Sequence, residues 1–553
     1  MTNDPKSNPV HYPPDRRLRV RIRTSYLCMI LALAALPVAM AWVQYLVAGL
    51  PEIGNLPKLP DEATRAHHFP GWLRLTHYVN FIFLVLLARS GLSILMDHPR
   101  LYFDVHCTPG SDWAKFTPIE VPADRVWTAK DDARYISPWL ALPGYRHTVG
   151  VARHWHLPGA LIWFLNGVIF VTLMFGTTEW KRLVPTSWAV VAEAWAIFVH
   201  YATLRLPPEP DPLIRYNALQ QLSYFTVVFV MAPLSALTGL AMSPSIDNRF
   251  RWYPRLFGGR QSARSLHFLL LVGYVAFLMM HVTMVFVNDP VRNFNGIVFG
   301  NDSERLLGLI CGLGAISAIV PICMVAHWLS WNRPRQLQYA AGSVHAVLRW
   351  LTFRLWKPCV RYAEDDISPF FWPNGKIPVS EEWTTLAAGN FADYRLKIGG
   401  LVDNPVELSL DDLKSLGRQE QITMHHCIQG WSGIAHWAGV PLERLVELVK
   451  PQQDAKVVVF RSFGEGLYGG EYYDTQPMDI ALQSETLLAW EMNFQPLPQL
   501  YGAPLRLRVE SQLGYKMVKW IRAIDFVDSE KSIGKGHGGK NEDDEYFDLI
   551  PEI

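Results

Sequence analysis

The stretch RSLHFLLLVGYVAFLMMHVTMVFV, residues 264–287, decides the first half of the fold. It exceeds the roughly 20 residues that a helix needs to cross the hydrocarbon layer of a bilayer. Two histidines interrupt its apolar sequence, His267 and His281, and they are 14 residues apart. That spacing makes about four helical turns and about 21 Å of axis, so both rings lie on one helix face. Because an ionisable side chain inside a membrane is costly, the stretch predicts a helix that offers ligands at two depths.

Further apolar runs of similar length predict an all-α transmembrane bundle of about six spans. The predicted spans are residues 25–49, 73–96, 155–176, 219–243, 266–287 and 306–330. Another apolar run, residues 186–204, contains Glu193 and His200. This run is compatible with a seventh span, but its two polar residues favour a helix that lies along the membrane interface.

The distribution of Lys and Arg predicts the orientation of the spans, because positive residues are retained on the cytoplasmic side. Four segments hold 6, 7, 5 and 6 of them, namely residues 1–24, 97–154, 244–265 and 330–361. The alternate segments hold 2, 4 and 2, namely residues 50–72, 177–218 and 288–305. Both termini are therefore expected in the cytoplasm. The pair Arg16–Arg17 before the first span also fits an export signal, and we favour the positive-inside anchor.

Histidines in two other spans match this pair in depth. His77 lies near the start of the second span, and His154 and His156 lie at the start of the third. With the orientation above, His77 shares the outer depth with His281, and His156 or His154 shares the inner depth with His267. Two histidines at one depth predict a bis-histidine heme, so the spans predict two hemes b. The alternative for each single histidine is a hydrogen bond to a neighbouring helix.

The membrane part resembles the diheme cytochromes b that anchor formate dehydrogenases, nickel-iron hydrogenases and thiosulfate reductases in bacterial membranes. The resemblance covers roughly residues 70–290 and rests on HPRLY at 98–102, RHWH at 153–156 and the 14-residue histidine pair. It implies that the quinone/quinol pool is the redox partner. The implied heme ligands are His77, His156, His267 and His281, with His154 as the alternative to His156.

The sequence of residues 375–553 is mixed in polarity and rich in turns, which predicts a soluble domain. A net charge of +1 in 553 residues argues against an electrostatic nucleic-acid binder. The six cysteines are scattered and do not form a disulfide framework. We predict a transmembrane cytochrome b domain at 1–335, an amphipathic connector at 336–364 and an α+β domain at 365–553. The C-terminal tail is acidic toward its end and is expected to be flexible, without chemistry.

The segment HHCIQGWSGIAHWAGVPL, residues 425–442, contains Cys427 without a CxxC partner. It therefore lacks the ligands for a zinc cage of its own. The simplest alternative is a buried, inert cysteine. A thiolate is also a soft ligand that can remain bound while a metal changes its oxidation state, so Cys427 is a candidate ligand to a redox metal.

This second part resembles the sulfite oxidase fold family of molybdopterin enzymes over about residues 365–540. Four collinear motifs carry the resemblance: SPFFWPNGKIP at 368–378, the Cys427 segment, LLAWEMNFQPLPQLYGAPLRLRV at 487–509 and GYKMVKWIRAIDF at 514–526. The resemblance implies that Cys427 binds molybdenum. Typical sulfite oxidases place arginines around the metal, whereas this segment offers His425 and His426, so His426 is a candidate donor to an oxo group or a substrate oxygen. The implied cofactor contacts are Asn374, Ser462, Tyr501, Arg506, Lys516 and Lys519.

Some of these residues have simpler interpretations. Tyr501 stands where the family usually has His or Asn, so its cofactor contact departs from the pattern. Lys519 also fits a solvated strand, and Ser462 fits a turn. His425 and His426 also fit ordinary polar loop residues.

Together these features predict a membrane-bound molybdenum oxidoreductase with two hemes b. It would exchange electrons between a small oxyanion, S-oxide or N-oxide and the quinone pool, in a direction that the sequence leaves open. The location predicted is the bacterial inner membrane, with the molybdenum domain on the cytoplasmic side. The alternative function is a diheme electron-transfer subunit whose molybdenum-fold domain is a non-catalytic docking module. The sequence is also compatible with a homo-oligomer.

Overall fold

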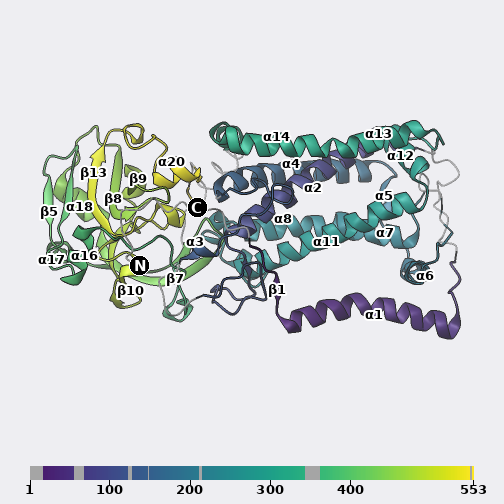
Figure 1. Cartoon of the computed structure of the whole chain (residues 1–553), viewed down its shortest axis with the longest axis horizontal. Coiled ribbons are helices and arrows are strands. Elements are labelled where there is room, and N and C mark those ends of the chain that lie inside the picture. Colours follow the sequence, from purple (N-terminus) through teal and green to yellow (C-terminus); the bar gives the residue numbers. More distant parts are fainter. Residues whose placement is uncertain are drawn as a thin grey trace, which may run out of the picture.

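The computed structural model describes residues 17–54, 68–121, 128–146, 148–208, 210, 215–342, 361–548 and 551–553. Figure 1 shows two parts, a bundle of long helices and a β-rich part at one end of it. The long helices precede residue 343, and both five-stranded sheets follow residue 360. This order confirms the predicted architecture of a helical membrane part followed by an α+β part. Most of the predicted connector falls on residues 343–360, outside the described residues.

Six helical segments are long and apolar enough to cross a membrane, each with 24 to 28 residues and a mean hydropathy of 1.7 to 2.4. They are α1 (Thr24–Ala48), α2 (Gly71–Asp97), α4 (Val149–Gly176), α7 to α8 (Ala218–Ala241), α11 (Arg260–Val287) and α13 to α14 (Leu306–Asn332). At most 22% of the most apolar window of any of them is buried by protein. Apolar helices with so little protein cover are expected to face lipid. The prediction of six spans is confirmed.

Two of these spans are composite. The fourth consists of α7 (Ala218–Phe225), the π-helix η1 (Thr226–Met231) and α8 (Ala232–Ala241). The sixth consists of α13 (Leu306–Ser317) and α14 (Ile319–Asn332).

The apolar run at 186–204 forms the short helix α6 (Ala189–Ala202). Its 14 residues extend about 21 Å, which is less than the roughly 30 Å of hydrocarbon in a bilayer. α6 packs on α1 and α7 at the end of the bundle away from the β-rich part (Figure 1). It is therefore not a seventh span. Helices α5 (Trp180–Leu183) and α12 (Pro290–Phe299) lie at the same end.

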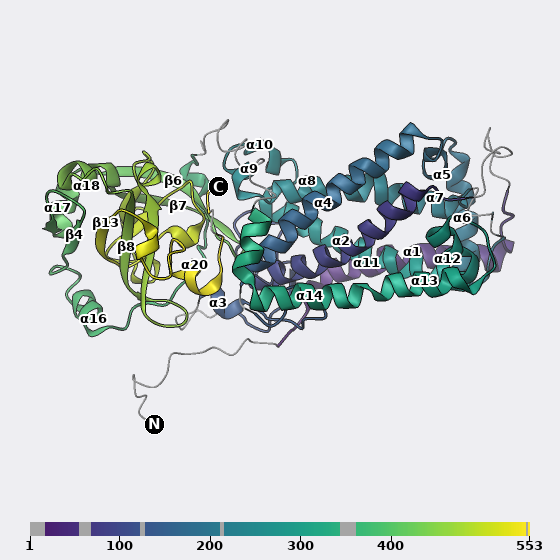
Figure 2. The same cartoon turned by 90° about the horizontal axis from the view of Figure 1, so that it is seen from above.

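At the opposite end of the bundle, α2 and α14 end and α4 and α11 begin, next to the β-rich part (Figures 1 and 2). The short elements of this end are α3 (Ala129–Asp132), α9 (Pro244–Asp247), α10 (Trp252–Arg255), β1 (Arg21–Ile22), β2 (Arg100–Leu101) and β3 (Ala114–Lys115). Arg100 and Asp132 form a buried ion pair with an Nε–Oδ2 distance of 2.7 Å. This ion pair fixes the loops between α2 and α4.

Two five-stranded sheets form the core of the β-rich part. One has the order β11-β10-β7-β6, with β12 also paired to β10, and the other has the order β5-β4-β13-β8-β9. The strands of the first are β6 (Gln419–His426), β7 (Ser432–Pro441), β10 (Leu487–Met492), β11 (Gln495–Pro496) and β12 (Arg506–Arg508). Those of the second are β4 (Leu396–Gly400), β5 (Val406–Leu408), β8 (Val457–Glu465), β9 (Glu471–Pro477) and β13 (Ile521–Val527). The accompanying helices are α16 (Glu381–Ala388), α17 (Leu410–Ser415), α18 (Leu442–Val449) and α19 (Met478–Ala481).

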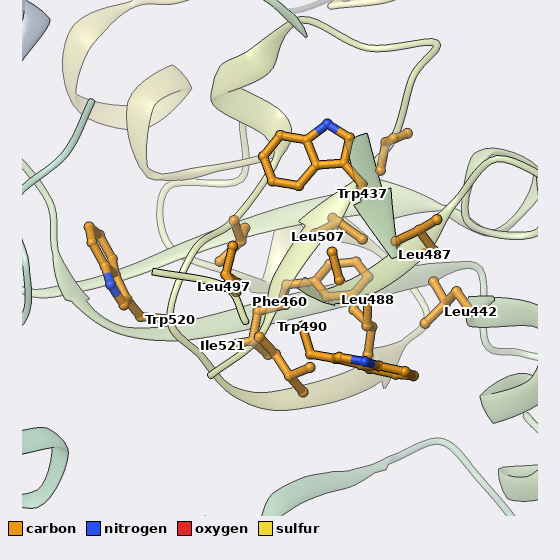
Figure 3. Packing of buried hydrophobic residues seen from close by; sticks show 14 of the residues in the cluster. Trp437, Leu442, Phe460, Leu487, Leu488, Trp490, Leu497, Leu507, Trp520 and Ile521 are labelled. Carbon is orange, nitrogen blue, oxygen red and sulfur yellow. The ribbon is translucent and has the colours of Figure 1, made fainter. Parts of the chain in front are cut away.

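Burial explains the composition of these strands. β7 is buried along almost its whole length, so its sequence runs apolar without the alternation of a half-exposed strand. Trp437 from β7, Phe460 from β8 and Leu488 from β10 belong to the same hydrophobic core (Figure 3). The core thus joins both sheets and holds the ends of β6 and β7 in place.

The C-terminal tail is folded, which corrects the expectation that it is flexible. It forms α20 (Lys540–Glu545), and Figures 1 and 2 show α20 where the β-rich part meets the bundle. Glu545 pairs with Lys130 at 2.9 Å, and Asp548 pairs with Arg153 at 3.0 Å. These partners are about 400 residues away in the chain, so the acidic composition alone could not reveal them.

Candidate active site

Cys427 lies in a tight turn between β6 and β7. Its backbone N–H donates to Trp431 O at 3.1 Å, and Gly430 N–H donates back to Cys427 O at 3.0 Å. Gly430 has a φ of +109°, a conformation that favours glycine. The turn therefore fixes the cysteine at the end of a buried hairpin.

The thiol of Cys427 is buried and lies in the wall of a large cavity. The cavity has a volume of about 1290 Å³, and only 4% of Cys427 is exposed. Its Sγ lies 3.9 Å from Asn374 Nδ2 and 3.8 Å from Gln429 Oε1. Burial raises the pKa of the thiol to about 12, so without a metal it is protonated at neutral pH. A metal ion that displaced this proton would gain a soft ligand.

Two cations, the buried Arg506 and the half-buried Lys519, line the same cavity. Arg506 donates to Tyr501 O at 2.9 Å, and its Nε has no hydrogen-bond partner. Lys519 donates to the carbonyl oxygens of Asn374 and Leu500. Among the described residues neither cation forms an ion pair, and burial together with Arg506 lowers the pKa of Lys519. Two unneutralised cations beside a buried thiol fit an anionic cofactor such as molybdopterin, whose phosphate they would hold.

Asn374 and Tyr501 also line the cavity. The hydroxyl of Tyr501 donates to Phe371 O at 2.7 Å, so this tyrosine braces the wall beside the two cations. The structure thus brings together Cys427, Asn374, Tyr501 and the pair Arg506 and Lys519.

Three predicted residues do not line the cavity, namely His426, Ser462 and Lys516. Lys516 is held instead by Asp474, by Glu542 at 2.7 Å and by Gly538 O at 2.9 Å. Ser462 donates to Lys519 O at 2.7 Å. The histidine in the wall is His425, the neighbour of His426.

His425 has one defined tautomer. Arg508 Nη1 lies 3.1 Å from its Nδ1, and a guanidinium can only donate. Nδ1 is therefore the acceptor, and the ring proton lies on Nε2. Burial and Arg508 hold the pKa of His425 well below its ordinary value, so the ring is a neutral hydrogen-bond donor.

Part of the cavity wall was not predicted from the sequence. Lys130, Tyr135, Arg146 and Trp331 come from the helical part, and Asn541, Glu545 and Phe547 come from the tail. These residues are far from Cys427 in the chain, so no local sequence pattern could predict that they line the same cavity. The cavity lies between the β-rich part and the near end of the bundle.

The histidines of the spans form two close pairs. The ring centres of His77 and His281 are 6.2 Å apart, and those of His156 and His267 are 6.3 Å apart. Two imidazoles on opposite sides of one metal ion, with metal–nitrogen distances of about 2 Å, have ring centres roughly 6 Å apart. Both pairs therefore fit the axial ligands of a heme. His154 Nδ1 instead faces Gly150 O at 2.7 Å, so His156 is the residue that faces His267.

Hydroxyl groups orient the inner pair. Ser90 Oγ donates to Leu86 O at 2.8 Å and lies 3.1 Å from His156 Nδ1. Thr238 Oγ1 donates to Leu234 O at 2.7 Å and lies 3.0 Å from His267 Nδ1. Since each hydroxyl uses its proton on the backbone, it accepts from Nδ1–H. Both rings thus present an unprotonated Nε2, the form that a metal requires.

The two halves of the chain match two known families. Residues 68–300 match the family described as prokaryotic cytochrome b561, and residues 384–533 match the family described as oxidoreductase molybdopterin binding domain. The chain therefore belongs to the molybdopterin-binding oxidoreductases and carries a membrane cytochrome b561 domain before that domain. These families imply a molybdenum–pterin cofactor and b-type heme.

Curated relatives match parts of the chain. YedZ1 of Azospira oryzae is 38% identical over 25% of this chain and 50% of its own length. MsrP of Xanthomonas axonopodis pv. citri, a protein-methionine-sulfoxide reductase catalytic subunit, is 35% identical over 24% of this chain and 45% of its own length. YuiH of Bacillus subtilis, an uncharacterized oxidoreductase, is 32% identical over 28% of this chain and 80% of its own length. The chain spans about half the length of the first two.

Proposed function

We propose that this membrane-bound molybdopterin oxidoreductase reduces a small S-oxide with electrons from the quinol pool, which pass through two hemes b. The observation that carries the proposal is the meeting of the Cys427 cavity with the end of a bundle that contains two histidine pairs. The substrate class follows from the sulfoxide reductase activity in the name of MsrP. The overall reaction consumes two electrons and two protons, converts the S-oxide to a thioether and releases water.

The membrane residues have a defined task in this proposal. His77 and His281 hold the outer heme iron, and His156 and His267 hold the inner one. Ser90, like Thr238, keeps Nε2 of its histidine unprotonated for the iron. Electrons from quinol would thus cross the bundle from one pair to the other.

The cavity residues bind the cofactor and the substrate. Cys427 holds molybdenum, and Arg506 and Lys519 hold the pterin phosphate, with Asn374 as a neutral contact. When bound, the cofactor supplies the two-electron change that accompanies transfer of the oxygen atom. His425 donates a hydrogen bond from Nε2 at the wall, in the role that the sequence assigned to His426. The proposed reaction consumes protons, so it requires no charged general base. This agrees with the neutral state of His425.

We place the molybdenum domain on the cytoplasmic side. The described Lys and Arg residues of the segments that precede α1, follow α2 and precede α11 lie at the end of the bundle that meets this domain. A reporter enzyme that is active only after export, fused to the C-terminus, would remain inactive. An active reporter would contradict this orientation.

The decisive experiment combines metal analysis with turnover. Detergent-purified wild type is expected to contain one molybdenum and two heme irons per chain, and Cys427→Ala to lose only the molybdenum. Wild type should oxidise a reduced quinone analogue when methionine sulfoxide is added, and the variant should not. Two irons without molybdenum, in a host that makes the cofactor, would instead support the docking-module function.

A further inference from the structure

The N-terminus of α11 touches the turn that holds Cys427. Arg260 Nη1 donates to Gly430 O at 3.1 Å, and Gln261 Nε2 donates to the same oxygen at 3.1 Å. Gln261 Nε2 also reaches Ser432 Oγ at 3.3 Å. Gly430 is itself hydrogen-bonded to Cys427. The helix that carries His267 is therefore two hydrogen bonds away from the cysteine.

The contact is buried. The first residues of α11, from Gln261 to Ser265, are covered by protein. Arg264 Nη1 and Nη2 donate to Arg100 O at 2.9 Å and His98 O at 2.7 Å, so α11 is tied to the chain just after α2. Gln429, in the same turn, donates to Asp97 O at the end of α2. The turn is thus held by α11, which carries His267, and by α2, which carries the Ser90 hydroxyl beside His156.

The distances along this path are short. His267 follows Arg260 by seven residues, about two helical turns or roughly 10 Å along the axis. Gly430 follows Cys427 by three residues. The bonded path from His267 to Cys427 thus runs along α11 and through this turn.

We propose that Arg260 and Gln261 are positioning residues for electron transfer between the inner heme and molybdenum. They hold the Cys427 turn against α11. Each electron then passes from the inner heme to molybdenum along this helix. The proposal rests on the proposed function and names the route within it. Two one-electron oxidations of the inner heme, each from ferrous to ferric iron, balance one two-electron reduction of molybdenum.

The test measures electron transfer from heme to molybdenum in the absence of the S-oxide substrate. The hemes of the holoenzyme are reduced anaerobically with duroquinol, and the rise of the molybdenum(V) signal is followed by freeze-quench electron paramagnetic resonance. Gln261→Leu is measured first, because it preserves size and charge, and the double variant Arg260→Met/Gln261→Leu second. We expect the double variant to be roughly tenfold slower, because it loses the three hydrogen bonds from these side chains to the turn, one of them charge-assisted.

The matched control is Arg251→Gln. Arg251 pairs with Asp366 at 3.1 Å, so this variant breaks another contact between the two parts of the chain without touching the Cys427 turn. The control should keep the wild-type rate. All three variants should keep normal heme spectra, molybdenum content and methionine sulfoxide reduction by reduced methyl viologen, which donates directly at molybdenum.

Two outcomes overturn the proposal. One is an unchanged rate in both α11 variants. The other is loss of molybdenum from both while the control stays loaded, because the contacts would then be structural. The proposed function fails in a different way, if heme reduction in the wild type yields no molybdenum(V) signal.

Discussion

Replacing Lys516 with methionine removes the cation that two buried carboxylates share. Lys516 contacts Asp474 and lies 2.7 Å from Glu542, and all three side chains are buried. Removing one partner of a buried ion pair costs about 3–5 kcal/mol. We expect about 3 kcal/mol, because the two remaining carboxylates can share a proton. Glu542 lies in α20, so the ion pair holds the C-terminal tail against the β-rich part. A loss of about 3 kcal/mol corresponds to a roughly 100-fold larger population of molecules with an undocked tail.

The assay is amide hydrogen exchange of α20 in the detergent-solubilised holoenzyme. The matched control is Lys535→Met, since Lys535 pairs with Asp544 at 2.7 Å but is 62% exposed. An exposed pair contributes about 0–1 kcal/mol, so the control should change exchange by less than about fivefold. Unchanged exchange of α20 in Lys516→Met would refute the reasoning. Loss of molybdenum with a protected tail would instead restore Lys516 as the cofactor contact predicted from the sequence.

The same group predicts a pH dependence. Burial raises the pKa of Asp474 and that of Glu542 above their ordinary values. A carboxyl with a raised pKa binds more protons in the docked tail than in the undocked tail, so docking weakens as pH rises above the ordinary carboxyl range. Exchange of α20, corrected for its intrinsic pH dependence, should therefore be faster at higher pH. Glu542→Gln should reduce the pH dependence of α20 exchange. The same pH dependence in this variant and in the wild type would contradict the role of Glu542.

Three further predictions concern the cofactors. His281→Ala should remove only the outer heme and His267→Ala only the inner one by absorption spectroscopy, and loss of the same heme in both would contradict the pairing. Thr238→Val should raise the potential of the inner heme by roughly 20–60 mV in a redox titration, because its ligand loses a hydrogen bond of about 0.5–1.5 kcal/mol and becomes less basic; an unchanged potential would exclude that role. Arg506→Gln should lower the molybdenum content several-fold by elemental analysis with both hemes retained, and full loading would exclude Arg506 as a phosphate contact.

Much of the architecture could be predicted because its signals are local. A run of apolar residues forms a spanning helix whatever surrounds it, since the backbone must satisfy its hydrogen bonds within the segment. The spacing of His267 and His281 follows from helix geometry alone. Cys427 was identified by its own motif together with three further motifs that follow one another along the chain.

The sequence by itself therefore determined the six spans, the depths of the histidines and the cysteine of the cavity. Only the tertiary structure decided that His156 rather than His154 faces His267, and that Lys516 binds the tail rather than the cavity. It also brought Lys130 to Glu545, 415 residues away. The physical reason is that helix and motif signals depend on neighbours in the chain, whereas the partner of a buried charge depends on which distant segments pack around it.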